Sequence, residues 1–342
     1  MSKPDLSVVI PVYNRGALAR FTLDSVSRAT RDLRVQTIVI DDGSTTPLAD
    51  ALAGLDLGPF TIHRQENRGL LFARLAGFER ATGNYVLFLD SDDLVHPDKF
   101  SHQLAAMRAE NADVSYSGEA AVPLDDTWVS APLRNLVVKG STRDPVEFFV
   151  NEQPSPHNPI FRTDYLRPLV HGSWMAPDPL FNSVAEIWFY YLCAVAPATR
   201  IVKVDAPLTL QGIHPGVRLS SHWERLALGS LAVMLAFARD CPVNPDTEPA
   251  RRALAARAFL AWRALPHGTP RAFDDRQMSV FDRLPRPPLA ALGGRSFQLL
   301  ALALGTRTAA ALLRRWQRPA YEEIRTLPPG EFARLAAQLP SQ

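Results

Sequence analysis

The chain has little cysteine and lacks any long uninterrupted hydrophobic run. Cys193 and Cys241 are its only cysteines among 342 residues, and they lack the close spacing of a zinc site or a disulfide framework. This cysteine usage fits a reducing compartment, so we expect a cytoplasmic protein with both thiols in its core. No stretch reaches the roughly 18 apolar residues of a membrane span. The opening MSKPDLSVVIPVYN predicts no secretion signal.

Two common nucleotide-binding fingerprints and a charge excess are also missing. The sequence contains neither GxGxxG nor GxxxxGK[ST], the usual signs of a nicotinamide-binding domain and of a P-loop. The net charge is only +2, so we expect no nucleic acid partner. Residues 1–224 hold 20 Lys+Arg against 26 Asp+Glu, and residues 225–342 hold 17 against 9. We interpret the basic C-terminal part as solvated helix faces, with peripheral contact to an anionic membrane surface as the alternative.

The first 90 residues alternate strand-like and helix-like segments. Apolar and β-branched runs predict strands at residues 6–12, 35–40, 61–64 and 85–89. Helices are predicted between them at residues 16–29 and 69–82. This alternation predicts a doubly wound α/β sheet with right-handed crossovers.

The composition changes after residue 222 to Ala, Leu and Arg with Pro-rich breaks. Helices are predicted there at residues 222–240, 248–264, 295–316 and 330–338. Before the change, further strands are predicted at 113–118 and 201–210, and a helix at 97–108. We therefore expect an α/β domain at residues 1–222 and a helical region at residues 223–342.

Three acids follow the strand at residues 85–89, in the sequence YVLFLDSDD. Clustered carboxylates repel one another unless a cation or hydrogen-bond donors compensate them. Asp90, Asp92 and Asp93 therefore predict a site for an oxygen-preferring divalent ion such as Mg²⁺ or Mn²⁺. The alternative is a solvated turn that caps the helix beginning near Pro97.

Polar residues follow each of the first four predicted strands. In open α/β sheets, ligands bind beyond the carboxyl ends of the strands, so we expect one crevice there. An aromatic such as Tyr13 could cover a nucleotide base, and Asp41 or Asp42 could accept its N–H, while a metal holds the diphosphate. For Tyr13 the alternative is a packed residue at the rim.

Four motifs carry a resemblance to a known family. VVIPVYN, VIDDGS, ENRGLLFARLAGFERATGNY and FLDSDD, in this order, closely resemble the nucleotide-sugar-binding half of the family 2 glycosyltransferases, which have the GT-A fold. The motifs span about the first 100 residues and are jointly specific. The resemblance implies a GT-A-like doubly wound mixed sheet, with a nucleotide-sugar-binding and catalytic domain at residues 1–222 and a C-terminal helical region.

The resemblance also implies roles for individual residues. Asp92 would be the metal ligand, with Asp90 facing the ribose or the metal. The residues implied to hold the base are Pro11, Tyr13 and Asp41 or Asp42, and those implied near the diphosphate are Asn67, Gly69 and Arg74. In IHPGVRLSSH, His214 and Ser220 match residues that close over the diphosphate; His214 would contact the metal or a phosphate, with a simple loop role as the alternative. Leu75 stands where many members have Asn, which weakens one polar contact.

The catalytic base is the point where this chain departs from the family. Glu186 is the one acid in the apolar, aromatic stretch FNSVAEIWFYYLCAVA, and burial there would raise the pKa of a carboxyl group, as suits a proton acceptor. Family members often carry Glu-Asp followed by an aromatic, whereas this chain has Ile187 after Glu186. We therefore expect either that Glu186 is the base, with Asp178 in reserve, or that activity is altered or absent. His157, in a Pro-rich loop, is expected to be structural, with acceptor contact as the alternative.

The resemblance implies a metal-dependent, inverting glycosyltransferase. It would use Mn²⁺ or Mg²⁺, a nucleotide-diphosphate sugar, with a UDP-sugar favoured, and a saccharide or lipid-linked acceptor in bacterial polysaccharide or glycolipid synthesis. One alternative is a catalytically impaired nucleotide-sugar-binding protein, which Ile187 favours. The other is a sugar nucleotidyltransferase, which the absence of a GxGTR-like loop after the first strand disfavours.

Overall fold

The computed structural model describes residues 3–138, 140–196, 198–216 and 222–339. The chain forms two compact units that are interleaved along the sequence. Unit 1 comprises Met1–Phe148, Glu152–Ser173 and Ala196–Gly216, and unit 2 comprises Phe149–Asn151, Trp174–Val195 and Val217–Gln342. Because Trp174–Val195 packs in unit 2, the units do not coincide with the domains expected from the sequence, and the boundary near residue 222 stays a prediction.

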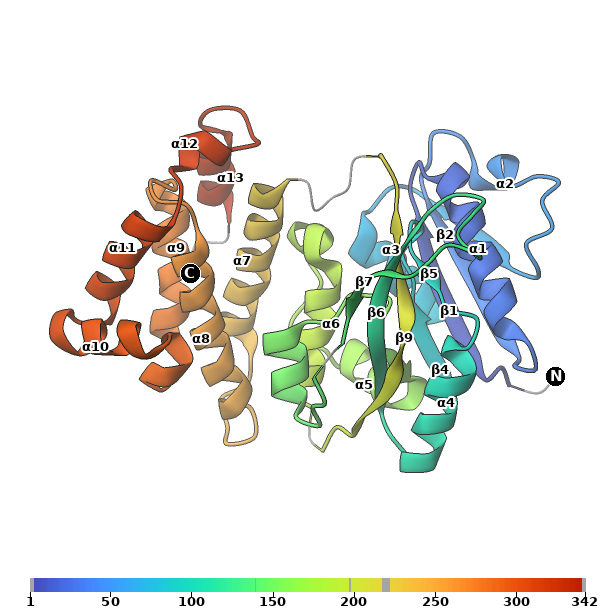
Figure 1. Ribbon diagram of the computed structural model, residues 1–342, viewed down its shortest axis with the longest axis horizontal. Helices are drawn as coiled ribbons and strands as arrows, with labels where there is room; N and C mark the ends of the chain where they lie inside the picture. The colour runs from blue at the N-terminus through green and yellow to red at the C-terminus, as the bar shows by residue number, and fades with distance from the viewer. Residues whose placement is uncertain (1–2, 139, 197, 217–221, 340–342) are drawn as a thin grey trace. The chain divides into compact units, whose positions relative to one another are not determined.

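Unit 1 is built on one mixed nine-stranded sheet, ordered β3-β2-β1-β4-β8-β6-β9-β5, with β7 paired to β6. The strands are β1 Leu6–Val12, β2 Val35–Asp42, β3 Thr61–Gln65, β4 Tyr85–Phe88, β5 Leu94–Val95, β6 Val114–Pro123, β7 Arg134–Val137, β8 Ile160–Arg162 and β9 Ile201–Ile213. Strands β1 to β4 run parallel. Strand β8 is antiparallel to both β4 and β6, and the long strands β6 and β9 lie side by side (Figure 1). The expected doubly wound mixed sheet is thereby confirmed.

Helices cover both faces of this sheet, and β1 is buried along its whole length. The helices of unit 1 are α1 Gly16–Thr30, α2 Leu48–Ala51, α3 Leu70–Arg80, α4 Lys99–Glu110 and α5 Thr163–His171. Val8 and Ile10 belong to a buried core that also includes residues of α1 and α4. On the other face, α3 packs directly against β1: a Cβ added at Gly77 would lie 2.3 Å from Cγ1 of Val9. The first strand is therefore packed on both sides.

Unit 2 is helical. Its helices are α6 Ala185–Ala194, α7 Trp223–Asp240, α8 Glu248–Ala264, α9 Arg271–Arg283, α10 Arg295–Leu304, α11 Thr306–Gln317, α12 Tyr321–Ile324 and α13 Glu331–Gln338. Short 3₁₀ turns lie at Pro179–Val184 and Leu289–Leu292, and a π-helical turn at Glu147–Glu152 joins the two units in sequence. Within the part of the chain that the structure describes, none of the helices has both the length and the apolar character needed to cross a membrane.

Candidate functional site

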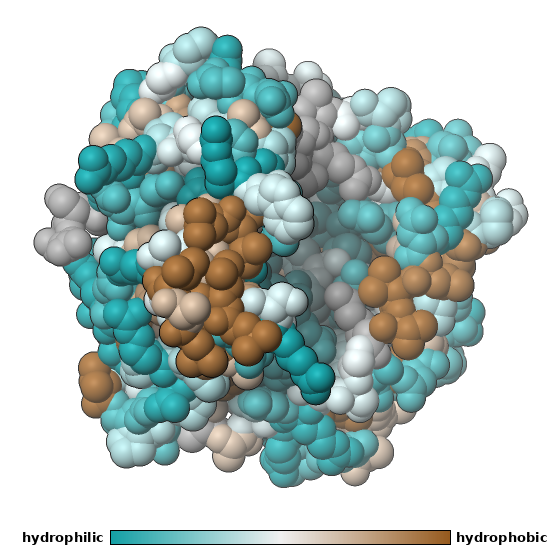
Figure 2. Space-filling model, turned by 60° about the vertical axis from the view of Figure 1, so that its left-hand side comes forward, coloured by the Kyte–Doolittle hydropathy of each residue, from teal (hydrophilic) through white to brown (hydrophobic). Residues whose placement is uncertain are grey.

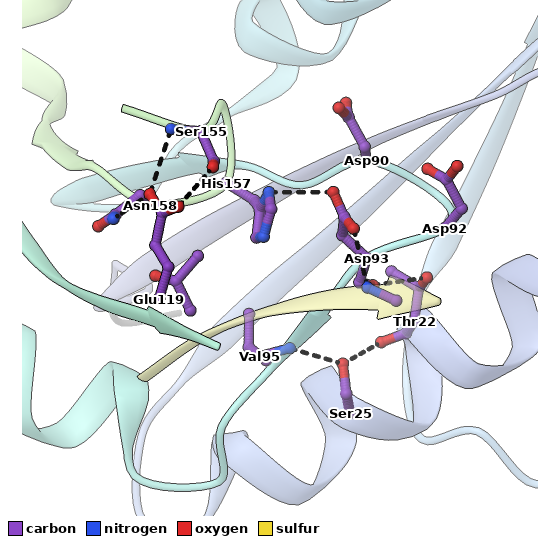
Figure 3. A network of polar contacts seen from close by, with 12 residues as sticks. Thr22, Ser25, Asp90, Asp92, Asp93, Val95, Glu119, Ser155, His157 and Asn158 are labelled. Carbon is purple, nitrogen blue, oxygen red and sulfur yellow. Dashed lines mark hydrogen bonds and ion pairs between the residues drawn. The ribbon is translucent and has the colours of Figure 1, made fainter. Parts of the chain in front are cut away.

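The carboxyl ends of β1, β2 and β4 and the loops that follow them carry several of the residues that the sequence marked as candidates. All of these loops belong to unit 1. Tyr13 follows β1 and is 51% exposed, whereas Asp41 and Asp42 end β2 and are buried. Asp90, Asp92 and Asp93 follow β4, where Figure 3 shows them grouped on one stretch of chain. The predicted convergence of these strand ends is thus present in the sheet, because β1 lies between β2 and β4.

Asp41 holds the turn after β2 in place. Its carboxylate accepts hydrogen bonds from the backbone N–H of Ser44 at 2.9 Å and of Leu48 at 3.1 Å, and from the guanidinium of Arg64 at 2.7 Å. Burial alone would raise the pKa of Asp41, but these hydrogen bonds and the charge of Arg64 outweigh it and lower the pKa. Asp41 is therefore an ionised anchor of the turn after β2.

Asp42 organises the segment that leads into α3. It accepts hydrogen bonds from the backbone N–H of Arg68 at 3.0 Å and of Gly69 at 2.8 Å, and from the side-chain amide of Gln65 at 2.7 Å. Gly69 has φ +90°, a conformation that other residues rarely adopt. Asn67 lies exposed on this same segment. Protein donors already bond to the carboxylate oxygens of Asp41 and Asp42. Recognition of a nucleotide base by either residue therefore stays a prediction.

Arg74 and Asp90 form a largely buried ion pair. Arg74 is 1% exposed and donates to Oδ1 of Asp90 at 2.6 Å. A guanidinium held in this way fixes the orientation of the Asp90 carboxylate, which keeps 22% of its side-chain surface accessible. The contact joins α3 to the loop after β4, and a role of Arg74 toward a diphosphate stays a prediction.

Asp92 lies between two side chains that come from distant parts of the sequence. Its Oδ2 atom is 3.1 Å from Nε2 of His214, and it also pairs with Arg15. Arg15 precedes α1 directly, and His214 directly follows β9. The pairing of Asp92 with His214 places together two of the three residues that the sequence proposed as metal ligands.

These side chains suit a divalent cation that arrives together with phosphates. A carboxylate oxygen and an imidazole nitrogen are donors that Mn²⁺ accepts. Within residues 3–138, 140–196, 198–216 and 222–339, no group of three or more His, Cys, Asp or Glu could enclose a metal ion. Ions such as Mg²⁺ are often held by one or two protein ligands, with substrate phosphates and water completing the shell. The donor set therefore fits a metal shared with a diphosphate ligand.

Asp93 has a structural role beside this site. Its Oδ1 atom accepts a hydrogen bond from the backbone N–H of Gly212 at 3.0 Å, and its Oδ2 atom is 3.1 Å from Nδ1 of His157 (Figure 3). The backbone oxygen of Asp93 accepts from the hydroxyl of Thr22 at 2.9 Å. Asp93 thus ties the loop after β4 to α1 and β9. His157 is buried, and burial lowers its pKa to about 4, which fits the expected structural role of this histidine.

A buried polar network lies next to His157, and the sequence did not reveal it. Lys99 is fully buried and donates to the backbone oxygen of Asn158 at 3.0 Å and to Oγ1 of Thr209 at 2.7 Å. The side-chain amide of Asn158 donates to Glu119 at 2.8 Å, and the hydroxyl of Ser155 donates to Glu119 at 2.9 Å. Burial lowers the pKa of Lys99 to about 7, although the charge of Glu119 acts to raise it. Lys99 is the first residue of α4, and nothing in the local sequence pattern indicates its burial.

The two candidate bases belong to unit 2. Glu186 lies half-buried in the first turn of α6, in which the residues from Ile187 to Ala194 are buried. Asp178 caps the 3₁₀ turn at Pro179–Val184, which precedes α6. Its Oδ1 atom accepts a hydrogen bond from the backbone N–H of Leu180 at 2.8 Å. The role of either carboxylate as base stays a prediction. Ser220 lies outside the described residues.

Comparison with known sequences finds related proteins for the first half of the chain. Residues 7–169 match the family described as glycosyl transferase family 2. The succinoglycan biosynthesis protein ExoW of Rhizobium meliloti is 38% identical over 115 residues, which are 32% of this chain and 35% of that protein. The uncharacterized glycosyltransferase YibD of Escherichia coli is 31% identical over 144 residues, or 41% of this chain and 42% of that one. The chain spans between about a fifth and a half of the length of the first curated relatives it matches.

Comparison with solved structures covers nearly the whole chain. TarS residues 1–349 of S. aureus superimpose with a TM-score of 0.60 at 16% identity, covering 91% of this chain and 89% of that one. The mannosyltransferase PcManGT of Pyrobaculum calidifontis, in complex with GDP-Man and Mn²⁺, gives a TM-score of 0.52 at 17% identity, covering 92% and 88%. At this identity the similarity shows the fold alone, which is that of GT-A-type glycosyltransferases.

Proposed function

We propose, because residues 7–169 match glycosyl transferase family 2, that this protein is a glycosyltransferase that moves a sugar from a nucleotide-diphosphate sugar to an acceptor hydroxyl. The observation that carries the proposal is the pairing of Asp92 with His214 beside the carboxyl ends of β1, β2 and β4. A carboxylate and an imidazole at this edge of the sheet suit the diphosphate of a donor and the cation that accompanies it.

A UDP-sugar is the donor we favour. The related fold of TarS has been solved in complex with UDP and with UDP-GlcNAc. In this chain the base would lie against exposed Tyr13, with Pro11 and Asp41 or Asp42 beside it. The diphosphate would lie toward the segment that carries Asn67 and Gly69, with Arg74 and Ser220 as the further contacts implied by the family.

The residues that would hold the metal are Asp92, Asp90 and His214, and the ion we expect is Mn²⁺ or Mg²⁺. PcManGT, which shares the fold, is in complex with Mn²⁺. When bound, such a cation offsets negative charge that develops on the departing nucleoside diphosphate. Arg15, paired with Asp92, supplies a second positive charge at the same place.

The reaction we expect is a single displacement with inversion at the anomeric carbon. Glu186, or Asp178 in reserve, would take the proton of the acceptor hydroxyl, whose oxygen then attacks that carbon. Glu186 lies half-buried at the start of α6, next to the buried aromatic residues of that helix. The acceptor would be a saccharide or a lipid-linked saccharide of bacterial polysaccharide synthesis, since ExoW is named for succinoglycan biosynthesis. Such synthesis fits a cytoplasmic location.

One observation favours a second function. Ile187 stands where many family members carry the aspartate that acts as base, so the chain could bind a nucleotide sugar without transferring it. The two functions differ in turnover and not in donor binding.

The test is a screen for binding followed by an assay of turnover. UDP, GDP and dTDP are titrated with and without Mn²⁺, and hydrolysis of the matching sugar nucleotide is then followed in the wild type, in Glu186→Gln and in Asp164→Asn, which changes an acid on α5. We expect hydrolysis that Glu186→Gln lowers about 100-fold, as expected for loss of a general base, and that Asp164→Asn leaves unchanged. Binding without turnover, unaffected by Glu186→Gln, would establish the second function, and pyrophosphate-dependent NTP formation would establish a nucleotidyltransferase.

A further inference from the structure

Helices α10 and α11 of unit 2 present an exposed apolar surface, which we call the α10–α11 face. Figure 2 shows a hydrophobic patch, bordered by hydrophilic residues, on the side of the molecule that carries these helices. The large apolar side chains exposed on the two helices are Leu299, Leu302, Leu304, Leu312 and Trp316. Leu302 is 76% exposed and Trp316 is 82% exposed. Soluble domains rarely leave a contiguous group of this kind uncovered without a partner for it.

The fold of unit 2 does not need these side chains for its own core. Helix α10 buries Phe297 and Ala301, one turn apart, and α11 buries Ala309 and Ala310. The exposed leucines project from the remaining surface of each helix, as the period of 3.6 residues requires. Both helices therefore carry apolar side chains on the solvent side as well as on the inner side.

Positive charge surrounds the α10–α11 face. The 39 residues from 283 to 321 contain seven arginines and no aspartate or glutamate. Arg307 and Arg286 pair with Asp282, and Arg314 pairs with Asp274 in the interior. In the described part of the chain, Arg295, Arg315 and Arg318 are exposed and form no ion pair with a carboxylate. The face thus combines leucine and tryptophan with uncompensated arginine.

We propose that the α10–α11 face docks on the surface of an anionic phospholipid bilayer. Leucine and tryptophan enter the boundary between headgroups and acyl chains, and arginine attracts anionic headgroups. Helices of 10 and 12 residues are about 15 to 18 Å long at about 1.5 Å per residue, too short for a hydrocarbon core of about 30 Å. The two helices would therefore lie along the membrane surface.

The charge pattern argues for lipid and against a second copy of the chain. In a symmetric dimer the same patch meets itself, so arginines that border this face in one copy would approach those of the other. No acid between residues 283 and 321 is available to compensate them. An anionic membrane surface is complementary to the same charges.

The first test measures binding of the full chain to vesicles without any nucleotide, so its outcome is independent of the proposed enzyme activity. Vesicles of phosphatidylcholine alone are compared with vesicles that contain about 30% phosphatidylglycerol, a composition that gives the surface a negative potential. We expect about tenfold more protein to sediment with the anionic vesicles, and high salt to abolish the difference. Equal sedimentation with both vesicles, or none with either, would overturn the proposal.

Matched variants locate the binding surface. The double substitution Leu302→Ser with Trp316→Ser removes two exposed apolar side chains and should lower vesicle binding about tenfold, with circular dichroism confirming that the fold is kept. Val243→Ser is the apolar control, because Val243 is 81% exposed outside this face. Arg295→Gln with Arg315→Gln should weaken binding to anionic vesicles, whereas Arg271→Gln, at a side chain 92% exposed on α9, should not. Unchanged binding of the double Ser variant, or loss of a dimer instead of loss of vesicle binding, would contradict the proposal.

Discussion

At Asp92 the carboxylate meets Arg15 and His214 at once, so its negative charge is compensated before any ligand arrives. A cation that binds Asp92 must compete with the guanidinium. We predict that Arg15→Gln raises the affinity for Mn²⁺ about fivefold in the absence of nucleotide, since a partly exposed ion pair is worth about 1 kcal/mol. The affinity of the wild type and of Arg15→Gln for Mn²⁺ is measured by titrating Mn²⁺ and following free Mn²⁺ by electron paramagnetic resonance. Arg20→Gln, which removes an exposed partner of Asp126, is the control, and weaker Mn²⁺ binding by Arg15→Gln would refute the competition.

Lys99 gives the fold a stability that depends on pH. Burial lowers its pKa from 10.5 to about 7 in the folded state, so between these values the unfolded chain binds a proton that the folded chain does not. The free energy of unfolding therefore rises with pH in this window, by at most about 1.4 kcal/mol per pH unit. We predict that the stability of the wild type relative to Lys99→Met increases from pH 7 to pH 10 in urea unfolding. A difference that stays constant over this range would show that Lys99 is charged in the fold.

At the scale of single elements, the sequence predicted the buried strands well and some of the helices less well. Strand β1 has the predicted bounds. Its sequence is an almost unbroken apolar run, which is typical of a buried strand, and all seven of its residues are buried in the structure. Helix α9 was not predicted, since its polar residues mask the apolar spacing. The helix expected at residues 295–316 is two helices, because Gly305 adopts φ +80° and ends α10.

Helix α3 packs so closely against β1 that we predict a loss of stability when a methyl group is added at their contact. Gly77→Ala should destabilise the fold by about 1 to 3 kcal/mol, because the new methyl group would overlap Val9, even though alanine is the better helix former. Gly294→Ala is the control, since a Cβ at Gly294 meets nothing within 4 Å. Urea denaturation measures both variants. A Gly77→Ala protein as stable as the wild type would mean that β1 can move away from α3.

Over the whole molecule, the sequence indicated candidate site residues but not the contacts among them. Asp92 and His214 are 122 residues apart, and only the family resemblance linked them. The pairing of Arg15 with Asp92 had no sequence signal, because it depends on how the start of α1 packs against the loop after β4. The burial of Lys99 had none either, because it depends on where Asn158 and Thr209 of β9 pack. The local pattern of apolar and polar residues predicts helices and strands. Polar contacts between segments that are distant in the sequence can be identified only from the tertiary structure.

In the proposed function, Asp92 binds a cation together with a nucleoside diphosphate. Isothermal titration of UDP into the wild type, into Asp92→Asn and into the exposed control Asp126→Asn, each in Mn²⁺ and in chelator, tests it most directly. We predict that the wild type and Asp126→Asn bind UDP at least about tenfold more tightly in Mn²⁺, a difference of about 1.4 kcal/mol, and that Asp92→Asn loses this gain. Equal affinity of the wild type in Mn²⁺ and in chelator would show that Asp92 does not hold a cation together with the diphosphate.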